Sequence, residues 1–490
     1  MRYTYARRSF QRLAAILVLL SCVSWQLLAK EALTQKQLIT ELDHHRGSSL
    51  VKGARLGLGI WDVESGKLIY SHQDSLLMAP ASTQKLFTAV AAFEQLGPDF
   101  RWQTTIGYRG QIVEGTLKGD LIVIGSGDPT WHEDFWPEGG EQLLALWADS
   151  LKTRGISTIE GNLVANVSHF PTKAWNPAWD LSDKPYGYAP AVSSLSLNAN
   201  RVTFNLKGGK TSGKKVAVSS TDSYNYITLS NALSTSKKSK AANTWAVPTK
   251  DSHKFIIKGS VPAGGKAQEK IGVREPEYYC MLALKDVMQK KGITLKGKIL
   301  SDSKLPDPDS LQVLFNHLSP PLSQVCKVML KTSSNFIAES LLHSLDRDYK
   351  LAIGKVLTAL DSLHVSTRGM KIQDGNGLSR TALCSPLQMG TMLCEITHQD
   401  WFEHFFGSLS IAGIDGTLQK RFSKSPARGS VFAKTGSMSG ISNLAGYLKT
   451  KDGRLLAFVA YGGKLKSVGN ARKWQEALCD IVYRYIDTDQ

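Results

Sequence analysis

The sequence lacks the motifs that identify several large hydrolase classes. It contains no G-x-S-x-G segment, which argues against an α/β-hydrolase, and no H-E-x-x-H segment of the zinc peptidases. The tripeptide Gly209-Lys210-Thr211 would need a glycine in place of Phe204 to complete a phosphate-binding loop. We therefore expect neither a metal ion nor a cofactor.

Cysteine is scarce, with six residues in a chain of 490, and no pair has the C-x-x-C spacing of metal or redox sites. Cys22 falls in the N-terminal segment, which leaves five cysteines scattered along helix-like sequence. We expect these five to be buried thiols. A disulfide is the alternative in an exported protein, although the sequence does not assign a pair.

Long apolar runs are absent except near the N-terminus. Several arginines precede an apolar run at residues 13–29, a pattern typical of a secretory signal peptide, here with cleavage after Ala29. Two alternatives would bring contact with a membrane: an uncleaved anchor, because the run approaches spanning length, and lipidation at Cys22. We expect an exported protein of the periplasm or cell envelope.

Acidic residues are outnumbered 42 to 59 by lysine and arginine, which gives a formal net charge of +17. Such a charge suits nucleic acid, an anionic membrane or an anionic polymer. Many of the lysines, however, fall in the Ser/Gly-rich stretch 207–270 rather than on a patterned helix, and no nucleic-acid-binding module occurs. We interpret the excess as generic surface charge and expect no nucleic-acid partner; the oligomeric state is left open.

Three short motifs occur in a fixed order along the chain. They are Ser82-Thr83-Gln84-Lys85, Ser333-Ser334-Asn335 and Lys434-Thr435-Gly436, which read S-x-x-K, S-x-N and K-T-G. This ordered set is typical of serine enzymes that are acylated by penicillin and by D-Ala-D-Ala peptides. It supplies a nucleophile, its activator, a proton relay and a carboxylate anchor without a histidine.

The context of Ser82 distinguishes it from four other serines that have the same S-x-x-K spacing. An amphipathic helix pattern follows it and ends at Gly97, so Ser82 is predicted at a helix N-terminus, where backbone N–H groups favour negative charge. Lys85 lies three residues on and shares one helical face with it. Lys434 opens a predicted meander, on an edge strand, with strands at residues 430–437, 441–449 and 455–461.

The pattern of apolar and polar residues changes twice along the chain. Residues 97–272 read as short alternating strands, and we interpret them as a β-rich insertion, in two subdomains, between the first and second motifs. Helical patterns return after residue 275, including a single predicted helix at 322–346. The catalytic domain is thus expected to combine residues 30–96 with residues 273–490.

Further segments extend the similarity beyond the three motifs. The chain resembles the class C low-molecular-mass penicillin-binding proteins, the D-alanyl-D-alanine carboxypeptidase/endopeptidase family of the penicillin-binding protein 4 type. The resemblance implies an α/β/α transpeptidase-like domain, split in sequence by the insertion. It implies an enzyme that trims peptidoglycan stem peptides and is inhibited by β-lactams. Its blocks include Gly127-Asp128-Pro129-Thr130, Asp374-Gly375-Asn376-Gly377, Asp415-Gly416-Thr417-Leu418 and Lys434-Thr435-Gly436-Ser437.

The catalytic hypothesis assigns one role to each motif residue. Ser82 attacks the carbonyl between the two D-alanines, and Lys85 accepts its proton, which requires a lysine pKa lowered by partial burial and by a nearby like charge. Ser333 relays the proton to the leaving nitrogen. Asn335 holds Lys85 and the substrate amide.

Substrate binding is assigned to the K-T-G segment and its neighbours. The N–H groups of Ser82 and Ser437 form the oxyanion hole, and Lys434 with Thr435 and Gly436 binds the terminal carboxylate.

Two further residues follow from the resemblance alone. It implies that Asp180 binds the free amino group of a diaminopimelate side chain and that Arg380 lies near the carboxylate of that side chain. Three alternatives to a DD-peptidase stay open: a β-lactamase, a non-catalytic wall-binding protein that retains the fold, and a related serine esterase or D-aminopeptidase.

Overall fold

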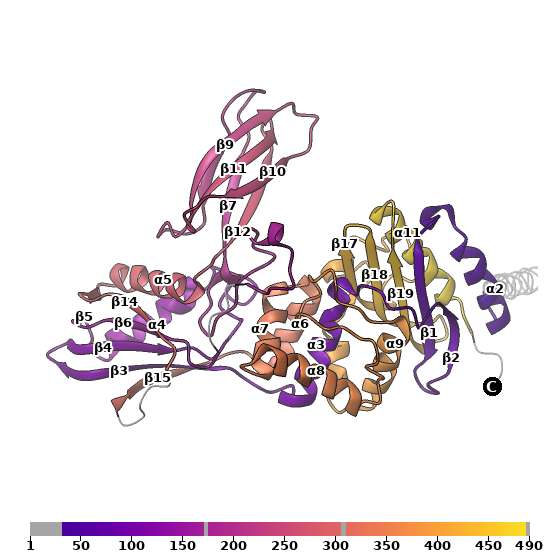
Figure 1. The fold of residues 1–490 in the computed structure, drawn as a ribbon, viewed down its shortest axis with the longest axis horizontal. Helices are drawn as coiled ribbons and strands as arrows, with labels where there is room; N and C mark the ends of the chain where they lie inside the picture. The colour runs from indigo at the N-terminus through magenta and orange to yellow at the C-terminus, as the bar shows by residue number, and fades with distance from the viewer. Residues whose placement is uncertain (1–31, 171–174, 305–309, 487–490) are drawn as a thin grey trace, which may run out of the picture.

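The computed structural model describes residues 32–170, 175–304 and 310–486. The predicted signal peptide, residues 1–29, lies outside the described residues and so does Cys22. Within those ranges, no helix is both long and apolar enough to cross a bilayer. The chain forms an α/β part that carries the three motifs and a mainly β part inserted into it (Figure 1).

A six-stranded antiparallel sheet organises the α/β part. Its strands lie in the order β16-β17-β18-β19-β1-β2, so a hairpin from the start of the chain extends the C-terminal meander. The predicted meander and hairpin are both present. The strands are β1 Arg55–Asp62, β2 Leu68–His72, β16 Ser410–Ile411, β17 Val431–Met438, β18 Ile441–Lys449 and β19 Leu455–Gly463.

Helices cover both faces of this sheet because its central strands alternate between two cores. On β18, Leu444 and Leu448 face α2 (Gln35–Arg46) and α11 (Val468–Tyr483), while Tyr447 faces the other core. The opposite layer appears beside the sheet in Figure 1. The α/β/α arrangement predicted from the sequence is therefore confirmed. The helices of the opposite layer are α3 Gln84–Leu96, α6 Leu322–Thr332, α7 Asn335–Leu345, α8 Tyr349–Ser362, α9 Pro386–Glu395 and α10 Phe402–Phe406.

The inserted part has its own seven-stranded sheet and its own core. Helices α4 (Glu141–Thr153) and α5 (Pro276–Lys290) pack on this sheet through residues such as Trp147 and Leu284. The strands are β3 Gln103–Val113, β4 Thr116–Ile124, β5 Thr158–Ile159, β6 Leu163–Asn166, β13 Thr294–Leu295, β14 Ile299–Asp302 and β15 Gln312–Leu318.

Two three-stranded sheets form the rest of the insertion. Their strands project away from the remainder of the molecule (Figure 1). One sheet has the order β12-β7-β8 and the other the order β10-β11-β9. The strands are β7 Arg201–Lys207, β8 Ala217–Ser220, β9 Thr228–Ser236, β10 Asn243–Pro248, β11 Lys254–Pro262 and β12 Lys266–Gly272.

Two elements that follow the boundary expected at residue 272 associate with the inserted part. Strand β15 pairs with β3 in antiparallel register, from Gln312 opposite Tyr108 to Leu318 opposite Gln103. Helix α5 also packs in the core of the insertion. The sequence pattern placed these elements in the catalytic domain because a return to helix looked like a domain boundary. We propose that the inserted part spans β3 to β15.

The single helix expected at 322–346 is two helices. Helix α6 ends at Thr332, the next residue, Ser333, adopts the left-handed conformation with φ 59°, and α7 begins after Ser334. The Ser334 hydroxyl accepts the Ile337 N–H at 3.2 Å and caps α7. The break places Ser333 and Ser334 between the two helices and lets Ser333 reach Lys434 on β17, while Asn335 begins α7. The five cysteines of the described ranges are buried and unpaired, as expected.

Candidate functional site

Ser82 lies in a single 3₁₀ turn, Ala81–Thr83, that leads directly into α3. The side-chain amide of Asn443 on β18 donates to the carbonyls of Ala79 at 2.9 Å and Pro80 at 2.8 Å. These bonds fix the turn against the sheet, and so position the Ser82 hydroxyl at the helix start. The sequence analysis missed Asn443, since nothing near it in the chain identifies its distant partners.

Lys85 is completely buried beneath Ser82. Its Nζ donates to Ser82 Oγ at 3.1 Å, to Asn335 Oδ1 at 2.7 Å and to the carbonyl of Asn376 at 2.7 Å. The first and second motifs, 250 residues apart in the chain, therefore meet at one amine. Asn376 belongs to the Asp374-Gly375-Asn376-Gly377 block, whose backbone forms the inner wall of the site.

Burial lowers the pKa of Lys85 to about 7, while the carboxylates of Asp374 and Glu339 oppose this shift. A large fraction of Lys85 is thus neutral near neutral pH and able to accept a proton. One part of the hypothesis needs correction. The burial of Lys85 is complete rather than partial, and the repulsion between the two amines also lowers the pKa of Lys434, after burial as the larger cause.

Lys434 joins the second motif to the third. Its Nζ donates to Ser333 Oγ at 2.8 Å and to the carbonyl of Thr435 at 2.8 Å. The left-handed conformation of Ser333 directs its hydroxyl toward β17. Hydrogen bonds thus join Ser82 and Asn335 to the amine of Lys85, and Ser333 to the amine of Lys434. The second motif contributes to both sets, which makes them one group of polar side chains.

Strand β17 presents a partly open edge to this group. The short strand β16 pairs with β17 only at Phe432 and Ala433, so the segment from Lys434 onward keeps that edge free of strand partners within the described ranges. The expectation of an edge strand thus holds for the motif, although β16 covers the start of β17. An extended peptide can add to such an edge through main-chain hydrogen bonds.

The K-T-G residues approach the nucleophile turn closely. A Cβ added to Gly436 would lie 2.7 Å from the carbonyl oxygen of Pro80 and 3.2 Å from the backbone nitrogen of Ser82. The Thr435 hydroxyl donates to the hydroxyl of Thr417 at 2.9 Å. Thr417 orients Thr435 through this hydrogen bond. It belongs to the Asp415-Gly416-Thr417-Leu418 block, but the sequence analysis assigned Thr417 no role.

A buried carboxyl supports the inner wall. Glu339 on α7 accepts the N–H of Gly375 at 2.9 Å and the side-chain amide of Asn376 at 3.1 Å. Burial, followed by the charge of Asp374, raises the pKa of Glu339 to about 8. Glu339 therefore holds the loop whose Asn376 carbonyl accepts a hydrogen bond from Lys85; it too was missed by the sequence analysis.

Asp180 and Arg380 lie near each other but apart from the buried group. Their side chains form a loose, exposed ion pair, with 4.0 Å between Arg380 Nε and Asp180 Oδ2. Asp180 Oδ1 accepts both the backbone N–H and the hydroxyl of Ser182, and these hydrogen bonds lower the Asp180 pKa. The family resemblance assigned both residues to the same substrate side chain, and their proximity is compatible with that assignment. The ligand itself stays a prediction.

The described residues contain no group of three or more histidine, cysteine or carboxylate side chains placed to hold a metal ion. The arrangement instead offers a hydroxyl beside a buried amine, a second hydroxyl on a second amine, and an open strand edge. Such a set can transfer an acyl group from a peptide to Ser82 and supply a proton to the departing nitrogen.

Comparisons with known proteins agree with this chemistry. Residues 38–481 match the family described as D-Ala-D-Ala carboxypeptidase 3 (S13). The chain is 29% identical to the D-alanyl-D-alanine carboxypeptidase of Actinomadura sp. (strain R39), over 87% of this chain and 81% of that protein. It is also 29% identical to the D-alanyl-D-alanine carboxypeptidase DacB of Haemophilus influenzae, over 84% of this chain and 86% of that protein.

Solved structures show the same relationship. The crystal structure of penicillin binding protein 4 from H. influenzae superimposes with a TM-score of 0.79 at 27% identity, covering 91% of this chain and 99% of that one. A second structure of that protein, in complex with a β-lactam, gives a TM-score of 0.75 at 26% identity, with the same coverage.

Proposed function

The chain belongs to the D-Ala-D-Ala carboxypeptidase 3 (S13) family, and on that basis we propose that it is a serine D-alanyl-D-alanine carboxypeptidase. Its substrates are peptidoglycan stem peptides, and β-lactams inhibit it by acylating the same serine. The observation that carries this proposal is the contact between Lys85 and Ser82, because a buried amine with a pKa of about 7 can activate a hydroxyl.

The proposed reaction begins when Ser82 Oγ attacks the carbonyl carbon of the penultimate D-alanine and Lys85 Nζ takes its proton. The N–H groups of Ser82 and Ser437 stabilise the oxyanion, each contributing about 3 kcal/mol if typical. Ser333 relays the proton held by Lys85 to the departing nitrogen as the C–N bond breaks, so Lys85 returns to its neutral form and Ser333 keeps its own hydroxyl proton. Water then hydrolyses the ester and restores Ser82. The substrate runs along the open edge of β17, with its terminal carboxylate at Lys434 and Thr435.

Two features support an exported site of action. The basic and apolar residues at the N-terminus are typical of a secretory signal, and the substrate class belongs to the cell wall. We place the mature protein in the periplasm or cell envelope. We propose in addition that the exposed residues Asp180 and Arg380 bind the charged end of the stem-peptide side chain.

The test uses the protein without residues 1–29 and its Ser82→Ala variant. Each is incubated with a fluorescent penicillin and then with a stem peptide ending in D-Ala-D-Ala. We expect a long-lived adduct by intact mass, and release of D-alanine, for the unsubstituted protein only. An adduct that forms equally on Ser82→Ala would refute the assignment of the nucleophile. Rapid turnover of nitrocefin would instead identify a β-lactamase, and absence of both adduct and product a binding protein.

A further inference from the structure

The excess of positive charge is concentrated on the two small sheets that project from the rest of the molecule (Figure 1). Residues 202–272, which form these sheets, contain 12 lysines and no arginine, against three acidic residues. Two of the acidic residues, Asp222 and Glu269, are buried. The third, Asp251, forms an ion pair with Lys254 at 3.2 Å. The interpretation of the net charge as generic surface charge does not account for this concentration.

Eight of the 12 lysines gather at one end of the two sheets. They lie in three segments, which we call the lysine tip: residues 207–215, 234–240 and 262–266. Backbone hydrogen bonds join the segments. The Gly208 N–H donates to the carbonyl of Gly265 at 3.0 Å, and the Thr235 N–H donates to the carbonyl of Lys214 at 3.0 Å. The lysine tip is therefore one surface rather than three separate loops.

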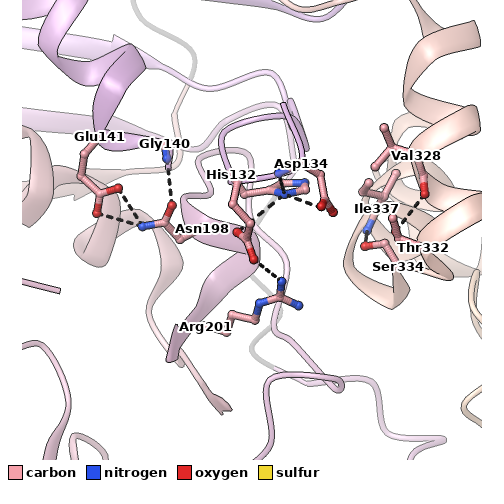
Figure 2. Close-up of polar contacts among 11 residues, drawn as sticks. His132, Asp134, Gly140, Glu141, Asn198, Arg201, Val328, Thr332, Ser334 and Ile337 are labelled. Atoms are coloured by element: carbon pink, nitrogen blue, oxygen red, sulfur yellow. Dashed lines mark hydrogen bonds and ion pairs between the residues drawn. The ribbon is translucent and has the colours of Figure 1, made fainter. Parts of the chain in front are cut away.

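The other end of the sheets, where β7 begins, has its charges matched. Arg201 forms an ion pair with Glu133 at 2.6 Å, and the Asn198 side-chain amide donates to the Glu141 carboxylate at 2.8 Å (Figure 2). In the lysine tip, by contrast, the sequence contains no acidic residue. All eight of its lysines are exposed, and none forms an ion pair with any residue that the structure describes.

Two lysines of the tip lie directly opposite each other on neighbouring strands. Lys266 on β12 is in antiparallel register with Lys207 on β7. Like charges in such a cross-strand pair destabilise a sheet. An anion beside the two ammonium groups removes this repulsion, so the pair favours contact with negative charge.

The use of lysine without arginine indicates the kind of anion. A guanidinium binds a single carboxylate or phosphate through two hydrogen bonds, whereas lysine is a compact charge on a flexible stem. Lysines spread over three segments thus suit a continuous layer of negative charge better than the separate carboxylates of a peptide. Beside the tip, on edge strand β10, Trp245 is 41% exposed and in register with Lys258. Exposed tryptophan is enriched at membrane–water interfaces.

We propose that the lysine tip docks on an anionic phospholipid membrane, with its ammonium groups at the lipid phosphates. The tip projects away from the α/β part (Figure 1), so this contact does not require the open edge of β17. The inference does not depend on the reaction at Ser82. Each lysine close to an anionic bilayer strengthens binding about fivefold.

The test measures binding of the protein without residues 1–29 to lipid vesicles by co-sedimentation. Those residues are removed because the apolar run at 13–29 would bind any bilayer. One set of vesicles is phosphatidylcholine alone, and the other contains about 30% phosphatidylglycerol. We expect binding to the anionic vesicles only, and its loss in about 0.5 M salt, which screens the charges.

A variant of the tip and a matched control each lose four exposed lysines. The tip variant combines Lys210→Gln, Lys214→Gln, Lys237→Gln and Lys238→Gln. The control combines Lys36→Gln, Lys52→Gln, Lys67→Gln and Lys420→Gln, all in the α/β part. We expect the tip variant to bind the anionic vesicles about 10²-fold more weakly, and the control to stay within about threefold of the unsubstituted protein. Both should keep the thermal unfolding midpoint and the rate of D-alanine release from a soluble pentapeptide.

Equal binding by the two variants would overturn the proposal, and so would equal binding of the unsubstituted protein to the two kinds of vesicle. Isolated peptidoglycan sacculi test the other anionic polymer of the envelope. If the tip variant loses binding to sacculi but not to vesicles, the tip binds the wall and the assignment to a membrane is wrong. Failure of the proposed function would look different, because penicillin would then form no adduct on Ser82 while vesicle binding persisted.

Discussion

At the scale of single residues, the site depends on placing two lysines close together in a dry environment. Lys85 and Lys434 are both fully buried, and each donates to a serine hydroxyl, Lys85 to that of Ser82 and Lys434 to that of Ser333. Burial disfavours the charged form of both amines, so the fold holds a base that an exposed lysine could not supply. The carboxylates of Glu339 and Asp374 limit how far the pKa of Lys85 falls.

The pH dependence of acylation follows from Lys85. Only its neutral form accepts the proton of Ser82, so the acylation rate constant should rise with pH, with a midpoint near 7, and level off above it. Lys85→Arg, which stays protonated, should lower the rate constant by at least about 10²-fold at every pH. The measurement is stopped-flow acylation by a fluorescent penicillin between pH 5.5 and 9.

The control for this series is Lys36→Arg, at an exposed position on α2, which should leave the profile unchanged. A midpoint near 10, or a Lys85→Arg variant that retains the rate and the profile of the unsubstituted protein, would contradict the role of Lys85 as base.

At the scale of elements, catalysis depends on the gap between β17 and the nucleophile turn. The strand approaches the turn at Gly436, where no side chain intervenes. The break between α6 and α7 serves the same gap from another direction, because the left-handed Ser333 reaches Lys434 on β17. Three elements therefore converge at this gap, and two of them do so through a residue with positive φ, Ala81 in the nucleophile turn and Ser333 at the break.

Widening this gap should reduce acylation without unfolding the protein. In Gly436→Ala, the new methyl group would lie 2.7 Å from the carbonyl oxygen of Pro80, so β17 must move away from Ser82. We expect the acylation rate constant to fall by about 10²-fold, the usual consequence of misplacing reacting groups by about 1 Å. Single-turnover acylation by penicillin measures this, and thermal unfolding shows whether the fold persists.

Gly354→Ala is the matched control for that substitution. Gly354 lies in α8, and an added Cβ meets no atom within 4 Å. Alanine in a helix interior should be neutral or stabilise the protein by about 0.5–1 kcal/mol, with acylation unchanged. Equal acylation by Gly436→Ala and Gly354→Ala would show that the close approach at Gly436 does not matter for the reaction.

The same elements show what sequence could and could not predict. The motifs, the meander and the helix after Ser82 were recognisable, because each rests on local spacing or periodicity. The break at Ser333 was not, because the apolar pattern continues across it and the residue's conformation is supported by a hydrogen bond to Lys434, 101 residues away. Asn443 and Glu339 were missed for the same reason, since their partners are distant in sequence.

At the scale of the whole molecule, the chain builds separate cores from interleaved segments. One core of the α/β part joins α3 with α6–α9, and a second joins α2 and α11 to the other face of the sheet. The insertion has a core of its own, to which α5 contributes. The sequence pattern predicts a start of the insertion at residue 97 and an end at residue 272, but it does not report the pairing of β15 with β3 across about 200 residues.

The buried cysteines provide a probe of each core. Cys280 lies in the core of the insertion, and the others lie in the two cores of the α/β part. Burial raises the pKa of every one of these thiols, to about 12 for Cys384 and Cys394, so alkylation requires unfolding. Pulsed alkylation across a urea series, read by peptide mass spectrometry, therefore reports the unfolding of each core separately.

We expect Cys280 to become labelled at a different urea concentration from the other four thiols, because separate cores unfold as separate cooperative units. Acylation by penicillin stabilises only the folded state that surrounds Ser82, so it should shift the midpoints of Cys326, Cys384, Cys394 and Cys479 upward and leave that of Cys280 in place. The Ser82→Ala protein treated with penicillin is the control and should show no shift. If all five thiols share one midpoint and move together, the insertion and the α/β part unfold as one unit, and the contacts of Phe170 and Val192 with the catalytic core would then be strong enough to couple them.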